Sequence, residues 1–109
     1  MIRQLRQRLT IEMPAPQPDG HGGQGDPWRT PTTLARVWGR VEPLRGRERL
    51  HGMQLEAGVT HRVTIRYRDD VTARHRLRLR ARVFNIRAVI DPEERHRFLE
   101  LLCEEGVAT

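Results

Sequence analysis

The strictest pattern in this sequence is the two-residue alternation that runs from Val59 to Tyr67. Apolar side chains and one histidine alternate there with threonine and arginine, so every second residue points to the same side. A period of two is typical of a half-buried β-strand and does not fit a helix. Residues 8–13 alternate in the same way, with leucine, isoleucine and methionine on one face. We therefore expect strands that bury one face against each other.

Further strand patterns follow in short segments that are separated by turn signals. Residues 32–43 are rich in strand formers, residues 75–82 alternate leucine with arginine, and residues 83–90 are again apolar. The last two segments require a tight hairpin near Arg80 and Ala81, although no glycine or asparagine is present there to supply positive φ. Several short strands with regular turns predict an all-β fold, a small β-barrel or sandwich.

Two connections interrupt the strands. Residues 14–31 form a long segment rich in proline and glycine in which Trp28 is the one large apolar residue, and we expect a loop. Residues 46–57 change to a helical period, which predicts one short helix that ends at Gly58. The chain of 109 residues is then a single domain, 1–109.

The segment after Pro92 supports two interpretations. Asp91, Pro92 and the two glutamates that follow resemble a helix start. Residues 96–105 fit a helix and a strand about equally, because Leu99, Leu101 and Cys103 would share a strand face while Phe98 and Leu102 would share a helical one. Periodicity alone leans towards the helix.

Charge is the second constraint on function. All 20 basic residues are arginine and the formal net charge is +6, which fits nucleic acid, an acidic protein surface or simple solubility. Arginines occupy every second position from 74 to 82, so on one strand all five would share a face. No aromatic residue lies among them to stack on bases, and pairing with carboxylates of neighbouring strands is the plainer interpretation.

Catalysis, metal binding and cofactor binding are not predicted. The five histidines lack the close spacing of zinc ligands, and no serine is present. The string Gly20-His21-Gly22-Gly23-Gln24-Gly25 matches GxGxxG, but no helix pattern follows it, so we interpret it as a loop. Cys103 lies in an apolar run and should be buried and unreactive. No apolar run approaches the roughly 18 residues that span a bilayer, and no secretory signal is recognisable.

Five stretches carry a resemblance to a known family: residues 5–11, 37–48, 60–72, 82–92 and 99–105. In order and spacing the chain resembles the bacteriophage head–tail joining proteins of long-tailed phages and phage-like gene transfer agents. These are also called head-closure or stopper proteins. The resemblance covers nearly the whole chain and is more specific than any single motif above.

The resemblance implies a small β-barrel with one helix between its second and third strands, and a strand after Pro92. It implies a structural virion protein, made in the bacterial host cytoplasm, and not an enzyme. Its partners would be copies of itself in a dodecameric ring, the portal and adaptor rings above, and tail terminator and tail tube proteins below. The ring would close the DNA exit channel and carry the tail, and packaged DNA would pass through it without sequence-specific contact.

Two sets of residues are candidates for these roles. The connection that projects into the channel and closes it would, by resemblance, include Arg45, Gly46, Arg47, Glu48, Leu50, Gly52, Met53 and Gln54. Candidates for contacts with neighbouring subunits or rings are Arg76, Arg78, Arg80, Arg82 and Trp28. We expect such contacts to cover exposed apolar edges of a thin core. The alternative is a small basic barrel of the OB or SH3 type that binds nucleic acid directly.

Overall fold

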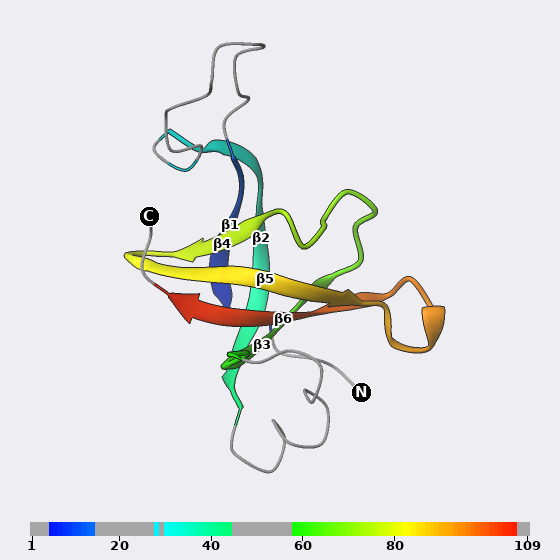
Figure 1. The fold of residues 1–109 in the computed structure, drawn as a ribbon. Coiled ribbons are helices and arrows are strands. Elements are labelled where there is room, and N and C mark those ends of the chain that lie inside the picture. Colours follow the sequence, from blue (N-terminus) through cyan, green and yellow to red (C-terminus); the bar gives the residue numbers. More distant parts are fainter. Residues whose placement is uncertain (1–4, 15–27, 29, 45–57, 107–109) are drawn as a thin grey trace.

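The computed structural model describes residues 5–14, 28, 30–44 and 58–106. Six antiparallel strands close into a barrel in the order β1-β2-β3-β6-β5-β4, and β4 pairs with β1 to complete the ring (Figure 1). The strands are β1 (Gln7–Met13), β2 (Thr32–Pro43), β3 (His61–Arg66), β4 (Arg76–Leu79), β5 (Arg82–Ile90) and β6 (Phe98–Gly106). The all-β barrel expected from the alternation is thus confirmed. The helix expected at residues 46–57 and most of the loop at 14–31 lie outside the described residues.

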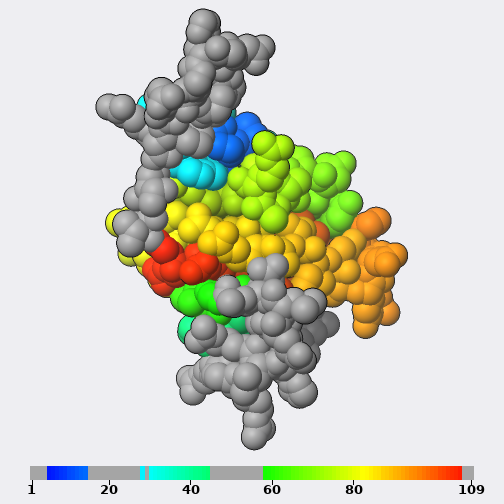
Figure 2. Space-filling view, in the orientation of Figure 1, coloured from blue at the N-terminus to red at the C-terminus, as the bar shows by residue number. Residues whose placement is uncertain are grey.

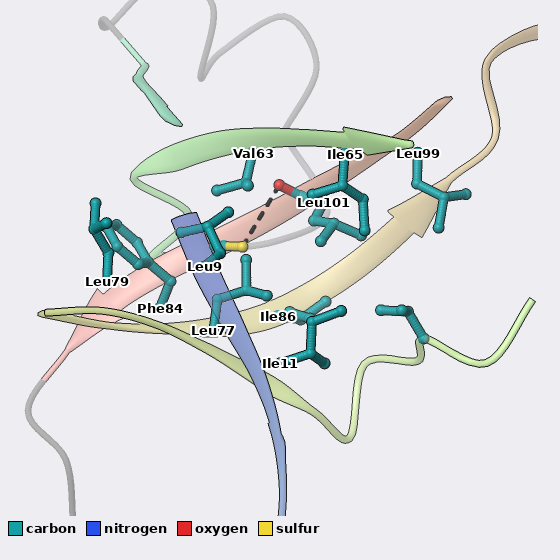
Figure 3. Packing of buried hydrophobic residues seen from close by; sticks show 12 residues of the cluster. Leu9, Ile11, Val63, Ile65, Leu77, Leu79, Phe84, Ile86, Leu99 and Leu101 are labelled. Carbon is teal, nitrogen blue, oxygen red and sulfur yellow. Dashed lines mark hydrogen bonds between the residues drawn. The ribbon is translucent and has the colours of Figure 1, made fainter. Parts of the chain in front are cut away.

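Alternation places one apolar face of every strand inside the barrel. Leu9 and Ile11 of β1 and Val63 and Ile65 of β3 are completely buried. Figure 3 shows these side chains pointing toward one another with those of the other strands. The rest of the cluster is formed by Val71, Leu77, Leu79, Phe84, Ile86, Leu99, Leu101 and Cys103. In the space-filling view of Figure 2, the side chains of β5, in yellow, cover the middle of the face that is seen, beside those of β6 in red.

The segment after Pro92 is a strand, and the helical interpretation of its periodicity is wrong. Leu99, Leu101 and Cys103 are buried together, as the strand alternative requires. The helix start forms a single 3-10 turn, η1 (Pro92–Glu94), which projects from the barrel beside β6 (orange in Figure 1). Tertiary pairing decides this, because β6 bonds to β3 on one side and to β5 on the other.

Closure of the barrel corrects the expectation of exposed apolar edges. β1 pairs with β2 on one side and with β4 on the other, with Ile11 opposite Leu77. Each of the six strands therefore has two neighbours, which removes the open edges that invite pairing with other chains. The large apolar side chains that are exposed in the described ranges are Trp38 and Ile90.

Two glycines answer local requirements of the barrel. A Cβ at Gly39 would lie 2.5 Å from a Leu9 methyl carbon and 3.0 Å from the Thr64 carbonyl oxygen, so β1, β2 and β3 come together closely at this point. Gly58 has a φ of +91°, a conformation that other residues rarely adopt, just before the chain enters β3.

The hairpin between β4 and β5 lies where the sequence places it. Leu79 pairs with Arg82, so Arg80 and Ala81 form a two-residue turn. Arg80 supplies the positive φ, +57°, in place of a glycine. A side chain in this conformation costs roughly 1–2 kcal/mol, which the flanking strand pairs must offset.

Candidate functional site

The arginines expected to form one ladder are distributed over two strands and a turn. β4 contains only Arg76 and Arg78, Arg80 lies in the turn, and Arg82 begins β5. Arg74 precedes β4 in a turn. The expectation that the five share a strand face is therefore wrong, because the chain reverses direction after Leu79.

Glu12 binds both arginines of β4 on the outer face of the barrel. Strand register places Glu12 opposite Arg76, and one carboxylate oxygen accepts a hydrogen bond from the Arg76 Nε at 2.8 Å. The other oxygen accepts from the Arg78 Nε at 3.0 Å. The Arg76 side chain is only 3% exposed and that of Glu12 only 9%, whereas Arg78 is 34% exposed. Buried charges of this kind persist only when they are paired.

Trp28 lies against this cluster. The Arg76 guanidinium carbon lies 4.2 Å from the centre of the Trp28 ring, a cation–π arrangement. This contact connects a residue of the long loop region to the buried charges of β1 and β4. The contacts of Arg76 therefore lie within the protomer, and its side chain is covered, whereas that of Arg78 is partly exposed.

Arg82 belongs to a second cluster, at the opposite edge of the β4–β5 hairpin. Its Nε and NH2 groups donate to the two Glu105 oxygens of β6 at 2.8 and 3.1 Å. These bonds hold the pKa of Glu105 below its usual value. His61 of β3 lies beside them, with its ring 5.1 Å from that of Phe84, and burial lowers the pKa of its imidazole.

Cys103 behaves as predicted from its apolar surroundings. It is completely buried, and burial raises the pKa of its thiol to about 12. The thiol donates to the Leu101 carbonyl oxygen at 3.5 Å (Figure 3). Such a thiol has neither the access nor the thiolate character of a nucleophile.

Sequence analysis did not single out the exposed face around Trp38. The alternation of β2 places Val37 and Val41 towards the core and leaves the Trp38 side chain outside, with 52% of the residue exposed. The Arg8 guanidinium of β1 lies 5.0 Å from the centre of the indole ring. The signal available in the sequence was a tryptophan out of phase with the valines on either side of it.

The remaining candidates are limited by what the structure describes. All residues of the expected channel-closing connection, Arg45 to Gln54, lie outside the described ranges. Within those ranges, no group of three or more histidine, cysteine, aspartate or glutamate side chains could hold a metal ion. No helix there is long and apolar enough to cross a membrane. What this geometry offers is a set of contact surfaces made of arginine, glutamate and tryptophan.

Comparisons with known proteins give a consistent result. A family model described as phage head completion protein matches residues 1–106. The fold is similar to the solution structure of protein SF1141 from Shigella flexneri 2a, with a TM-score of 0.75 and 29% identity over 97% of this chain and 96% of that one. It is also similar to a chain of the virion of a native gene transfer agent particle, with a TM-score of 0.65 and 21% identity over 98% of this chain and 100% of the other. Among curated proteins, none matches the sequence.

Proposed function

This chain belongs to the phage head completion protein family, structural proteins of the virion that are not enzymes, and on that premise we propose that it is a head–tail connector subunit. In this role, copies of the barrel form a ring below the portal and adaptor rings of a filled head. The ring closes the DNA exit channel after packaging and provides the surface to which the tail attaches. The observation that carries the proposal is the family match over residues 1–106.

The closed barrel supports this role. Its six strands leave no unpaired edge in the described ranges, so copies can associate through side chains without merging their sheets. The connection between β2 and β3, which contains Arg45 to Gln54, would project from this fixed frame and close the channel. This connection joins two paired strands at Pro43 and His61, so a change of its conformation need not disturb the core.

The arginine pairs argue against the alternative of direct nucleic-acid binding. Arg76 and Arg78 share the Glu12 carboxylate, and Arg82 binds Glu105. Guanidiniums that are already paired with carboxylates within the protomer release fewer counterions from a DNA backbone, so they add less affinity. The exposed ends of Arg78, Arg80 and Arg82 are better suited to contacts with neighbouring subunits or rings, and Arg76 with Trp28 would support that surface from beneath.

Deletion of the gene from a genome that produces particles tests the proposal. We expect heads that package DNA, lose it, and carry no tails; addition of the purified protein to these heads should restore nuclease-protected DNA and tail attachment. Tailed particles that retain their DNA after the deletion would contradict the connector role.

A second variant separates closure from attachment. Replacement of residues 46–57 by a glycine–serine linker of equal length should release DNA while the ring still docks on the head.

The nucleic-acid alternative makes a different prediction, namely salt-sensitive binding of free duplex DNA by the isolated protein. Binding of that kind at physiological salt, together with normal particles after deletion, would favour the alternative.

A further inference from the structure

A pocket lies between β2 and the end of β3, and none of its lining residues belongs to β4 or β5. Its volume is about 250 Å³, and its lining is formed by Leu5, Val37, Trp38, Arg66, Tyr67 and Arg68. Pockets for drug-sized ligands span roughly 300–1,000 Å³, so this one suits a single aliphatic or aromatic side chain. The ring of His96 lies 4.5 Å from that of Tyr67, and the Tyr67 N–H donates to the Arg97 carbonyl oxygen, which holds this wall against the start of β6.

Tryptophan at this position has no role in the barrel core. The residue is 52% exposed, and it alternates with half-buried Val37 and buried Gly39, so the register of β2 keeps it outside. Tryptophan and arginine are the residue types that most often dominate binding energy at protein interfaces. Here Arg8 stacks on the Trp38 ring from β1, and Arg66 lines the pocket from β3 on its other side.

Positively charged side chains lie at the pocket and beside it. Arg66 and Arg68 line it, and Arg8 contacts the ring of Trp38, which also lines it. Arg8 and Arg66 are exposed, and neither forms an ion pair with a carboxylate within the part of the chain that the structure describes. Arg68 differs, because Asp70 binds it through two hydrogen bonds of 2.8 and 2.9 Å. Arg8 and Arg66 lie on β1 and β3, the two strands that pair with β2. From the usual spacing of paired strands, their backbones are about 10 Å apart. A complementary occupant therefore needs carboxylates on both sides of an apolar group.

We propose that this pocket binds an acidic segment of another protein of the particle, with one aliphatic or aromatic side chain inserted beside Trp38 and carboxylates paired with Arg8 and Arg66. The inference rests on the proposed connector function for the source of that segment, since connector subunits lie between other virion proteins. A peptide fits these observations better than packaged DNA. The bases of a duplex are stacked on one another, so they cannot insert into an apolar pocket without being flipped out.

The direct test is an NMR titration of the full-length ¹⁵N-labelled protein. The probe is an acetylated and amidated pentapeptide of sequence Asp-Asp-Leu-Asp-Asp. We expect saturable shifts of the Trp38 indole N–H and the Tyr67 amide, with a Kd at or below about 1 mM. Arg66→Glu should weaken binding at least tenfold, and Trp38→Ala should abolish it. Both side chains are largely outside the core, so the unchanged remainder of the spectrum will show that these variants fold.

A matched control distinguishes the pocket from the general positive charge. Arg80→Glu makes the same change of charge in the exposed β4–β5 turn, outside the pocket, and should alter the Kd less than twofold. Equal losses in the Arg66 and Arg80 variants would overturn the proposal. So would equal binding of a peptide with glycine in place of leucine, or with lysine in place of aspartate.

A further arm separates the two classes of polymer. If oligothymidine displaced the peptide and bound more tightly, with the same dependence on Trp38 and Arg66, the site would belong to single-stranded nucleic acid and the peptide assignment would be wrong. The experiment is independent of particle assembly. Failure of the peptide to bind would overturn the pocket proposal but not the connector function. Normal particles after gene deletion would contradict the connector function, and the specificity of the pocket could still be measured.

Discussion

Replacement of Glu12 by glutamine removes the negative charge that Arg76 and Arg78 share. The two side chains of the Glu12–Arg76 pair are 9% and 3% exposed, so water cannot take over the lost interaction. Glutamine keeps the shape and can still accept a hydrogen bond, but the Arg76 guanidinium would remain buried without a counter-charge. Loss of one partner of a buried ion pair costs about 3–5 kcal/mol in the free energy of unfolding.

The chain provides a matched control at Glu42. This carboxylate also bridges two arginines, with Arg40 at 3.3 Å and Arg62 at 3.4 Å, but it lies on a more open surface, where the Arg40 side chain is 48% exposed. Exposed pairs of this kind contribute about 0–1 kcal/mol. The two substitutions make the same chemical change, so the difference between them reports the greater burial and the shorter distances of the Glu12 pairs.

Urea unfolding and thermal unfolding, each followed by circular dichroism, measure both variants. Glu12→Gln should lower the midpoint with little change in the m-value, and at roughly 4 °C per kcal/mol for a chain of this size it should lower the Tm by about 12–20 °C. The double variant Glu12→Leu, Arg76→Met should recover most of that loss, because an apolar pair needs no counter-charge. Equal destabilisation by Glu12→Gln and Glu42→Gln would refute the reasoning.

Three further predictions concern single positions. Burial lowers the pKa of His61 and of His75, so the unfolded chain binds protons first and stability should fall as the pH drops below about 6.5; a flat urea midpoint between pH 8 and 5 would contradict this. Gly39→Ala should cost about 1–3 kcal/mol, because its Cβ would lie 2.5 Å from a core methyl carbon, whereas Gly106→Ala meets only a flexible side-chain amide and should cost less in the same assay. With a pKa of about 12, roughly one Cys103 thiol in ten thousand is ionised at pH 8, so a thiol reagent should label the native protein far more slowly than the urea-unfolded one; equal rates would rule out the buried position.

Local alternation was sufficient to predict β1 and β3. The pattern at residues 59–67 contains β3, and the pattern at 8–13 corresponds to β1. A two-residue period is enough here because it identifies directly the side chains that share a face. The segment after Pro92 could not be decided in this way, since its apolar residues satisfy both periods. For this segment the resemblance to a family predicted the strand correctly, whereas periodicity alone favoured a helix.

Contacts between distant strands could not be read from the same pattern. Glu12 and Arg76 are separated by 64 residues, and only the closure of the barrel through β1 and β4 brings them together. Because the turn falls at Arg80, Arg82 is directed to Glu105 and not to the carboxylate that its neighbours share. Which outer residues become covered depends on register and closure, and these are properties of the whole sheet.

The exposed position of Trp38 has a similar cause. The segment 32–43 contains four large apolar residues whose spacing does not follow a single period. β2 accommodates this with an irregularity beside Ile11, where the register against β1 shifts by one residue at Leu34. One extra residue of this kind is invisible to a count of apolar positions, but it decides which of them face water.

The pairing of β1 with β4 has a consequence for biosynthesis. β1 leaves the ribosome before the other strands of the barrel, and its second partner appears only after more than sixty further residues have been translated. Until then β1 presents a bare edge to every neighbouring nascent chain, and non-local pairings of this kind form slowly. An affinity tag placed before Gln7 leaves the pairing of β1 with β4 intact. A truncation that removes part of β1 would open the barrel and leave β2 and β4 as unpaired edge strands, which promote aggregation.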